Sequence, residues 1–196
     1  MRFVIVVDTQ RDFMAADGAL SVAGADALAE PMRTWLAALD PAEVAGVLFT
    51  FDTHVPEVYA GSPEAEAFPL HCVRGSAGWA NMLDIGLVDP AIPACRIEKG
   101  VFDMWAEPGL VIEDARDPGA ARIARESFFA DLKAGGTTEV AVIGVAADYC
   151  VKWAIDGLVE RGFRVTVPAS LTRGIDRQIE AVAAEDFAGR AVTLAA

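Results

Sequence analysis

A cysteine, an aspartate and a lysine far apart in the sequence each follow a predicted buried strand. Asp8 comes directly after the apolar run 2–7, Lys99 follows the weaker strand pattern 94–98, and Cys150 comes a few residues after the apolar run 139–145. Because ligands bind at the carboxyl ends of the strands in open parallel sheets, we expect these three side chains to converge. A thiol beside a carboxylate and an ammonium group suits nucleophilic catalysis with proton transfer.

Each of the three residues has a chemical role in this arrangement and an ordinary alternative. Cys150 opens a predicted helix, where free N–H groups and the positive end of the helix dipole favour the thiolate. Asp8 suits a base that takes the thiol proton and returns it to a leaving amine, and Lys99 would keep both groups ionised. The alternatives are a buried core cysteine, a turn-forming aspartate and a solvated lysine.

A second set of polar residues surrounds a long segment, 53–78, that is rich in Gly, Pro and Ser. The chain has 2 His, and both fall in this segment. Asp52, His54, Glu64 and His71 together offer two imidazoles and two carboxylates, a donor set that suits Zn, Mn or Fe better than Ca or Mg. The alternative is a capping aspartate, a solvated glutamate and two hydrogen-bonded histidines.

The elements that must position these residues alternate between strand and helix. The runs 2–7, 44–51 and 139–145 are apolar and β-branched without alternation, as in strands buried on both faces. Weaker strand patterns occur at 94–98, 163–167 and 191–194, and helical patterns at 25–39, 121–134, 149–161 and 177–187. The order predicts an α/β protein: one doubly wound domain over 1–196, with about six strands in a mostly parallel sheet and helices on both faces.

Composition narrows the classes of partner. Asp+Glu 29 against Lys+Arg 16 gives a net charge of −13, which argues against binding to nucleic acid or to an anionic membrane surface. Three cysteines without metal-finger spacing, and no early apolar run long enough for a signal peptide, favour a reducing cytoplasm. A non-enzymatic module that binds a partner through its acidic surface would explain the charge but not the expected convergence of reactive groups.

The order and spacing of these residues resemble those of a known family. The matching segments are 8–13 (DTQRDF), 52–54 (DTH), 63–64 (PE), 68–75 (FPLHCVRG), 99–100 (KG) and 144–151 (GVAADYCV). Together they resemble the isochorismatase-like cysteine hydrolases, and among them the nicotinamidases, along almost the whole chain. Isochorismatase itself is disfavoured because that enzyme lacks the nucleophilic thiol.

The resemblance implies roles for individual residues. Asp8, Lys99 and Cys150 match the catalytic triad, and the metal ligands match Asp52, His54, Glu64 and His71. The resemblance also implies a cis peptide between Val145 and Ala146, with the backbone N–H groups of Ala146 and Cys150 forming an oxyanion hole. Phe13 and Phe68 match aromatic walls that contact the substrate ring, with an ordinary core position as the alternative for both.

The activity that the resemblance implies is hydrolysis of nicotinamide to nicotinate and ammonia through a cysteine thioester. In the resembled family a divalent metal, here zinc with manganese or iron as alternatives, binds the pyridine nitrogen. The resemblance also implies a small-molecule amide substrate and a homo-oligomer. The alternative is another cysteine amidohydrolase of the superfamily that acts on a carbamoyl compound or small aliphatic amide. The segment 101–109 departs from the family's pocket-lining segment, and its Trp105 suits either a pocket wall or the core.

Overall fold

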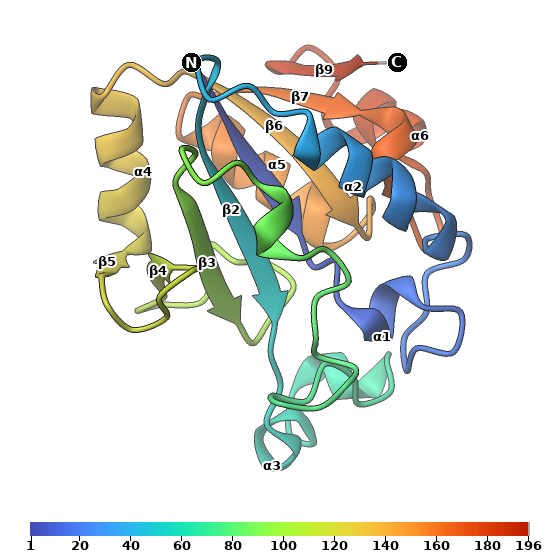
Figure 1. Ribbon diagram of the computed structural model, residues 1–196. Coiled ribbons are helices and arrows are strands. Elements are labelled where there is room, and N and C mark those ends of the chain that lie inside the picture. The colour runs from blue at the N-terminus through green and yellow to red at the C-terminus, as the bar shows by residue number, and fades with distance from the viewer. Residues whose placement is uncertain (196) are drawn as a thin grey trace.

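A twisted sheet with helices on both faces forms the body of the protein (Figure 1). The computed structural model describes residues 1–195. Within this range the strands are β1 (Arg2–Val7), β2 (Val44–Asp52), β3 (Ala94–Lys99), β4 (Val111–Asp114), β5 (Arg122–Ala124), β6 (Glu139–Val145), β7 (Arg164–Pro168), β8 (Thr172–Arg173) and β9 (Val192–Ala195). The helices are α1 (Arg11–Met14), α2 (Ala29–Ala37), α3 (Pro56–Tyr59), α4 (Arg125–Ala134), α5 (Cys150–Glu160) and α6 (Ile179–Asp186), with short 3₁₀ turns η1 (Asp26–Leu28), η2 (Pro63–Glu66), η3 (Ile85–Leu87) and η4 (Ala169–Leu171).

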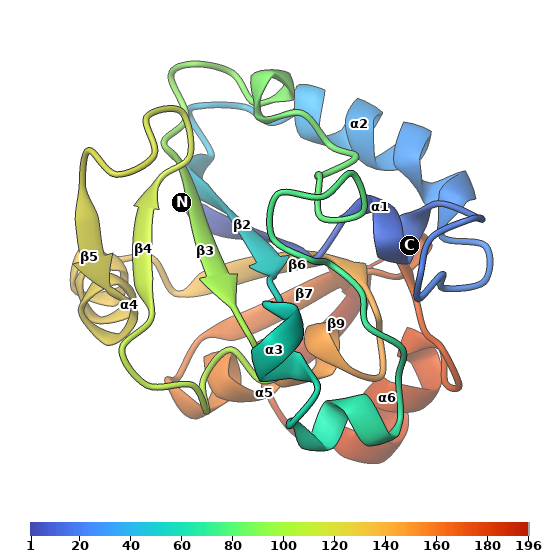
Figure 2. The ribbon, with the colours of Figure 1, turned by 90° about the horizontal axis from the view of Figure 1, so that it is seen from below.

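The strand order places the topological switch point beside β1. The order is β5-β4-β3-β2-β1-β6-β7-β9, with β8 paired to β6. From β1 the chain builds β2 and β3 outward on one side, and it later returns to place β6 on the other side of β1. In doubly wound sheets a ligand binds at such a reversal, outside the carboxyl ends of the strands. That edge, where α1 and α3 lie, is the lower edge in Figure 1 and faces the viewer in Figure 2.

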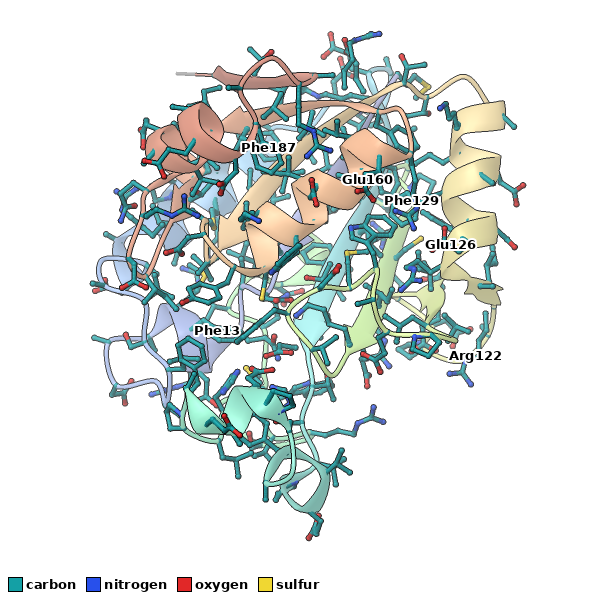
Figure 3. All side chains as sticks on the ribbon, turned by 180° about the vertical axis from the view of Figure 1, so that it is seen from behind. Phe13, Arg122, Glu126, Phe129, Glu160 and Phe187 are labelled. Carbon is teal, nitrogen blue, oxygen red and sulfur yellow. The ribbon has the colours of Figure 1, made fainter. Side chains whose placement is uncertain are left out.

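Alternate side chains of the central strands enter two separate cores. Val4 and Val6 of β1 pack in the core under α2, which contributes Met32 and Leu36. Phe3, Ile5 and Val7 of the same strand pack in the opposite core, which α4, α5 and α6 cover (Figure 3). Burial on both faces is the reason why the first strand is uniformly apolar.

The structure confirms the predicted α/β fold with a mostly parallel sheet, but the sheet has nine described strands rather than about six. The additional strands β4, β5 and β8 have four residues or fewer, and β5 is fully exposed. Short, exposed strands bury too little apolar surface to leave a pattern in the sequence. For the same reason the predicted helix 121–134 proves to be the short strand β5 followed by α4. The pairs β3/β4 and β4/β5 are antiparallel, and the other strand pairs are parallel.

Two further observations concern expectations from composition. Cys72, Cys95 and Cys150 are free, so the structure contains no disulfide among them. Among residues 1–195, none of the helices combines the length and the apolar character needed to cross a membrane.

Candidate active site

Lys99 lies at the centre of three groups that the sequence predicts to converge. Its Nζ atom is 2.8 Å from Oδ2 of Asp8 and 3.6 Å from Sγ of Cys150. These two distances limit the separation of the Asp8 oxygen and the Cys150 sulfur to about 6.4 Å. Lys99 is the last residue of β3, Asp8 follows β1, and Cys150 is the first residue of α5, so three separate elements deliver the groups to one place. All three side chains are buried.

Asp8 is held by a residue that sequence reasoning missed. The backbone of Asp8 has φ 46°, a left-handed conformation that is uncommon outside glycine. Its N–H donates to Oγ1 of Thr50 at 3.1 Å, and the Thr50 hydroxyl donates to Oδ1 of Asp8 at 2.5 Å. Thr50 is the only polar residue inside β2 before Asp52, and it lies two residues before Asp52 on the same face. A single threonine in an otherwise apolar strand is the sequence feature that could have identified Thr50 as part of the site.

Gln10 joins the ends of β1 and β2. Its side-chain N–H donates to the backbone oxygen of Asp52 at 2.7 Å, and its Oε1 accepts the Asp52 backbone N–H at 2.8 Å. The side chain therefore extends the sheet ladder by one residue at the carboxyl edge. In the sequence Gln10 is part of the matching segment 8–13, and this structural role was not expected from it.

Burial and charge set the protonation of the reacting groups. Burial alone would lower the pKa of Lys99, but the carboxylates of Asp52 and Asp8 raise it well above its usual value. Burial raises the pKa of the Cys150 thiol well above its usual value; the charge of Lys99 opposes this shift, and the charges of Asp8 and Asp52 add to it. The resting sulfur is therefore a thiol.

The raised pKa of Cys150 agrees with the expectation that a base takes the thiol proton, and it opposes the expectation that the helix terminus and Lys99 keep the sulfur ionised. The predicted position of Cys150 at the first turn of a helix is confirmed. The helix terminus and Lys99 do favour the anion, but a sulfur removed from solvent beside two carboxylates loses more from desolvation and repulsion than it gains. Burial of this kind cannot be inferred from the sequence.

Asp52 links this group to the four predicted metal ligands. Its Oδ1 accepts from Nζ of Lys99 at 3.3 Å, whereas its Oδ2 lies 3.0 Å from Nε2 of His54 and 3.0 Å from Nε2 of His71. Oε1 of Glu64 is 3.6 Å from the His54 nitrogen and 3.3 Å from the His71 nitrogen. One ligand atom from each of the four residues lies within 4.8 Å of the others.

The hydrogen bonds of this cluster test whether it fits a cation. Nδ1 of His71 lies 2.8 Å from the carbonyl oxygen of Pro69, which can only accept, so Nδ1 carries the proton. In the neutral ring Nε2 then presents a lone pair toward Asp52 and Glu64, which also have only lone pairs. Oε1 of Glu64 is buried and accepts no hydrogen bond from any residue between 1 and 195. Lone pairs from two nitrogens and two oxygens that face one point fit a divalent transition metal.

Without a metal, protons must take the place of the cation. Burial alone would lower the pKa of His54 and His71, but the close carboxylates of Asp52 and Glu64 raise both to about 9. Burial raises the pKa of Asp52, yet Lys99 and the two histidines bring it well below its usual range. The cluster therefore carries positive charge in either state, on the rings or on a bound ion.

Tyr59 supports the ligand loop and was not identified from the sequence. Its ring packs edge-on against His54 and His71, at 4.5 Å and 5.6 Å between centroids. Its hydroxyl oxygen is 3.0 Å from the carbonyl oxygens of both Phe68 and Pro69. Tyr59 thus connects α3 to the chain that leads to His71.

Two backbone N–H groups between the end of β6 and the start of α5 have no partner among residues 1–195. The peptide bond between Val145 and Ala146 is cis, as the resemblance implies. Within residues 1–195 the N–H groups of Ala146 and Cys150 donate to no backbone or side-chain acceptor, although their neighbours Ala147 and Val151 do. Free donors beside a nucleophile are the geometry that stabilises an oxyanion.

The two predicted aromatic walls lie at different ends of the site. Phe13 is buried with its ring 5.1 Å from that of His71. Phe68 packs against Tyr149, the residue before Cys150, at 5.4 Å, and against Phe102 at 5.5 Å. Phe13 therefore borders the ligand cluster, and Phe68 borders the rings of Tyr149 and Phe102.

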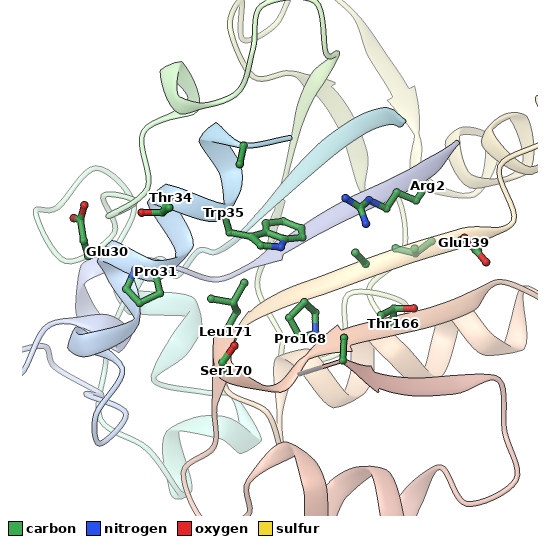
Figure 4. Close-up of a pocket in the computed structure, with 14 residues that line it drawn as sticks. Arg2, Glu30, Pro31, Thr34, Trp35, Glu139, Thr166, Pro168, Ser170 and Leu171 are labelled. Atoms are coloured by element: carbon green, nitrogen blue, oxygen red, sulfur yellow. The ribbon is translucent and has the colours of Figure 1, made fainter. Parts of the chain in front are cut away.

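A larger groove lies elsewhere on the molecule. It has a volume of about 760 Å³ and runs between α2 and the strands β6, β7 and β9, with Trp35 and Leu171 on its walls (Figure 4). None of the predicted site residues lines it. A smaller cavity of about 200 Å³ borders the site through His54, Tyr59 and Lys99. The cluster of reactive side chains therefore identifies the site in this protein, and the volume of the grooves does not.

Comparisons with known proteins identify the family of the chain. A family model for the isochorismatase domain matches residues 2–196. The nicotinamidase/pyrazinamidase of Mycobacterium tuberculosis is 30% identical over 199 residues, which cover 99% of this chain and 98% of that protein. Pyrazinamidase of Pyrococcus horikoshii, solved in complex with zinc, is 26% identical with a TM-score of 0.70, covering 99% of this chain and 98% of that one. PnC1 of L. infantum, solved in complex with nicotinate, is 29% identical with a TM-score of 0.70, and the match covers 100% of this chain and 92% of that one. The chain therefore belongs to the isochorismatase family.

Proposed function

We propose that this protein hydrolyses nicotinamide to nicotinate and ammonia, with Cys150 as the nucleophile. Its family and its similarity to a nicotinamidase/pyrazinamidase indicate an amidohydrolase. The observation that carries the finer proposal is that Lys99 contacts Asp8, Asp52 and Cys150 at once, so that a nucleophile, a base and a four-ligand cluster share one buried site.

Acylation begins with proton transfer from the thiol of Cys150 to the carboxylate of Asp8. The sulfur attacks the amide carbon, and the N–H groups of Ala146 and Cys150 stabilise the oxyanion. Loss of one such donor typically costs about 3–4 kcal/mol of barrier. Asp8 then gives its proton to the departing nitrogen, ammonia leaves, and the acyl group remains on sulfur as a thioester.

Deacylation uses the same carboxylate in reverse order. Asp8 takes a proton from water, the resulting hydroxide attacks the thioester carbon, and the acid is released. The proton returns from Asp8 to the sulfur of Cys150, which restores the thiol favoured at rest. Lys99 keeps its charge throughout because the carboxylates of Asp52 and Asp8 outweigh burial and raise its pKa, and it orients Asp8 for both steps.

The metal ligands in this proposal are Asp52, His54, Glu64 and His71, with zinc as the first candidate and manganese or iron as alternatives. When bound, the ion supplies a Lewis acid for the ring nitrogen of a pyridine amide. The pyrazinamidase solved with zinc supports this assignment. Phe13 beside His71 and Phe68 beside Tyr149 would contact the two ends of the substrate ring.

The second candidate is another cysteine amidohydrolase of the superfamily, acting on a different small amide or carbamoyl compound. Its metal-free members do not need the ligand cluster. The clustering of all four ligand atoms within 4.8 Å therefore favours the pyridine amide.

Ammonia release from nicotinamide by the metal-loaded protein tests the proposal. We expect turnover in the natural chain and a loss of about 10⁴-fold or more in Cys150→Ala. Cys95→Ala is the matched control, because Cys95 lies on β3 away from the site and should be dispensable. Turnover by Cys150→Ala at the natural rate would refute the proposal, and turnover of a small carbamoyl compound alone would favour the second candidate.

The setting of the reaction is part of the same proposal. A free buried thiol nucleophile suits a reducing cytoplasm, where nicotinamide hydrolysis would serve NAD salvage. The proposed assembly is a homo-oligomer, as is common for soluble enzymes. Sedimentation of the protein at several concentrations tests the assembly, and a monomer throughout would contradict it.

A further inference from the structure

The segment 100–110 begins directly after Lys99 and is fixed by its own side chains and by α4. Oε2 of Glu107 accepts the backbone N–H of Gly100 at 2.6 Å, which closes the segment into a ring. The guanidinium of Arg125, at the start of α4, donates to the carbonyl oxygen of Glu107 at 2.9 Å and to that of Met104. The segment therefore has a defined shape although it contains no helix or strand.

Trp105 fastens this segment to the helix that begins with Cys150. Its indole N–H donates to the carbonyl oxygen of Trp153 at 3.0 Å. The guanidinium of Arg161 lies 3.9 Å from the ring centroid. Trp153 and Gly157 are four residues apart on one face of α5, and Arg161, four residues further on, directly follows the helix. The structure thus resolves the two sequence alternatives for Trp105 in favour of packing in the body of the protein.

Gly157 is needed for this contact. A Cβ atom at Gly157 would lie 2.2 Å from Nε1 of Trp105, far inside contact distance. Gly157 therefore acts as a socket for the indole ring. Because glycine is a poor helix former, its presence in the middle of α5 is explained by the close approach of the ring and not by the helix itself.

The fastened segment carries an aromatic ring, that of Phe102, which packs against Tyr149 and Phe68. The ring of Phe102 lies 5.3 Å from that of Tyr149 and 5.5 Å from that of Phe68. Tyr149 immediately precedes Cys150, and Phe68 matches an aromatic wall of the substrate ring in the resembled family, so Phe102 packs against two residues that the proposed function associates with the substrate. The only residues between Phe102 and the anchor at Trp105 are Asp103 and Met104.

We infer that Trp105, seated on Gly157, is a positioning residue that holds Phe102 against Tyr149 and thereby makes the site selective for amides with a planar ring. The inference rests on the proposed function for its substrate class. It assigns to Trp105 an effect on substrate choice, exerted through Phe102, and no contact with the reacting atoms.

Gly157→Ala tests the inference because it displaces the indole without changing any residue at the site. Alanine favours the helix, so α5 should persist. In the metal-loaded enzyme we expect kcat/KM for nicotinamide to fall about tenfold, through KM, as for a lost pocket contact. The same ratio for acetamide should stay unchanged. Glu160→Ala is the matched control, since Glu160 lies on the exposed side of the same helix (Figure 3).

A purely structural role for Trp105 would give a different result. In that case both amides would lose activity by the same factor, or neither would change, and either outcome overturns the inference. If Gly157→Ala does not fold, Trp105→Phe provides the same comparison, because it removes the indole N–H and part of the ring while keeping an aromatic side chain.

A second readout separates this inference from the proposed function. Alkylation of Cys150 by iodoacetamide, and by an iodoacetamide with a phenyl ring on its nitrogen, requires no turnover. We expect Gly157→Ala to slow the aromatic reagent relative to the small one. A natural enzyme that hydrolyses neither amide would refute the proposed function, whereas an unchanged ratio of alkylation rates would refute the inference.

Discussion

The two halves of the site are built in different ways. Asp8, Lys99 and Cys150 sit at the end of a strand or the start of a helix, where the sheet ladder and α5 fix the backbone. Of the four ligand residues, only Asp52 belongs to a strand of the sheet. The other three lie in the loop that follows β2, which is tied back mainly by the bridge between His54 and Val73 and by Tyr59.

The two halves of the site also differ in how their charged groups are paired. In the first half the ammonium group of Lys99 contacts the carboxylates of Asp8 and Asp52, so each negative group already has a positive partner. In the second half the lone pairs of His71, Asp52 and Glu64 face one another unless a proton or a cation intervenes. The sheet thus preorganises the reacting groups, whereas the ligand loop depends on what it binds. The four predictions below follow from this difference.

The largest effect is expected from Asp8→Asn in the preorganised half. The amide keeps the size of the side chain but cannot take the Cys150 proton, so acylation should slow by about 10²- to 10⁴-fold. Stopped-flow measurement of the first turnover checks this. Asp17→Asn is the control, because Asp17 is exposed and pairs only with Arg11. A first turnover at the natural rate would remove Asp8 from the mechanism.

Removal of metal should affect the ligand loop and spare the reacting groups. After chelation we expect kcat/KM for nicotinamide to fall by about 10²-fold, since several kcal/mol of Lewis-acid interaction are lost. The rate of Cys150 alkylation by iodoacetamide should not change, because Lys99 and Asp8 remain in place. A chelated protein whose sulfur also loses its reactivity would show that the two halves are not separable.

Metal affinity should depend steeply on pH. The pKa of His54 and His71 is raised to about 9 without metal, so each ring must release a proton when the ion binds. Affinity should rise by up to about 100-fold per pH unit from pH 6.5 toward 9. By the same sign, the stability that the protonated rings give the metal-free protein is complete below pH 6.5 and is lost as pH rises through 9.

Calorimetric titration of zinc into the metal-free protein, in buffers with different ionisation enthalpies, counts the released protons. His71→Ala should release one proton fewer. Affinity that stays constant between pH 6.5 and 9 would contradict the protonated cluster.

The smallest effect is expected from Thr50→Val, which removes the hydroxyl that holds Asp8 but keeps the shape of the side chain. The N–H of Asp8 loses its acceptor, which costs about 1–3 kcal/mol for a buried donor. We expect kcat to fall about tenfold with KM unchanged. Thr166→Val on the exposed face of β7 is the control. An unchanged kcat in Thr50→Val would show that the backbone hydrogen bonds of the sheet position Asp8 without the Thr50 hydroxyl.

The sequence predicted the preorganised half well because strand ends have a strong pattern. Apolar runs that stop at Asp8 and Asp52 mark the edge of the sheet, and the bounds of β1 and β6 agree with the predicted 2–7 and 139–145. The four ligand residues also proved to be neighbours, although their loop has little regular structure.

What could not be predicted depends on the register between strands and on burial. Thr50 reaches Asp8 because β1 and β2 align Val6 with Phe49, and the sequence does not reveal that alignment. The thiol state of Cys150 follows from its removal from solvent, which only packing determines. Trp105 suited a pocket or the core equally well until the structure placed it over Gly157.

The most direct test of the central claim is the mass of the intact chain when a single turnover of nicotinamide is stopped with acid at successive times. An enzyme that works through Cys150 should gain and then lose the mass of one nicotinoyl group, attached to the peptide that contains this cysteine. If nicotinate accumulates during that turnover while the chain keeps its original mass at every time, the sulfur is not the nucleophile.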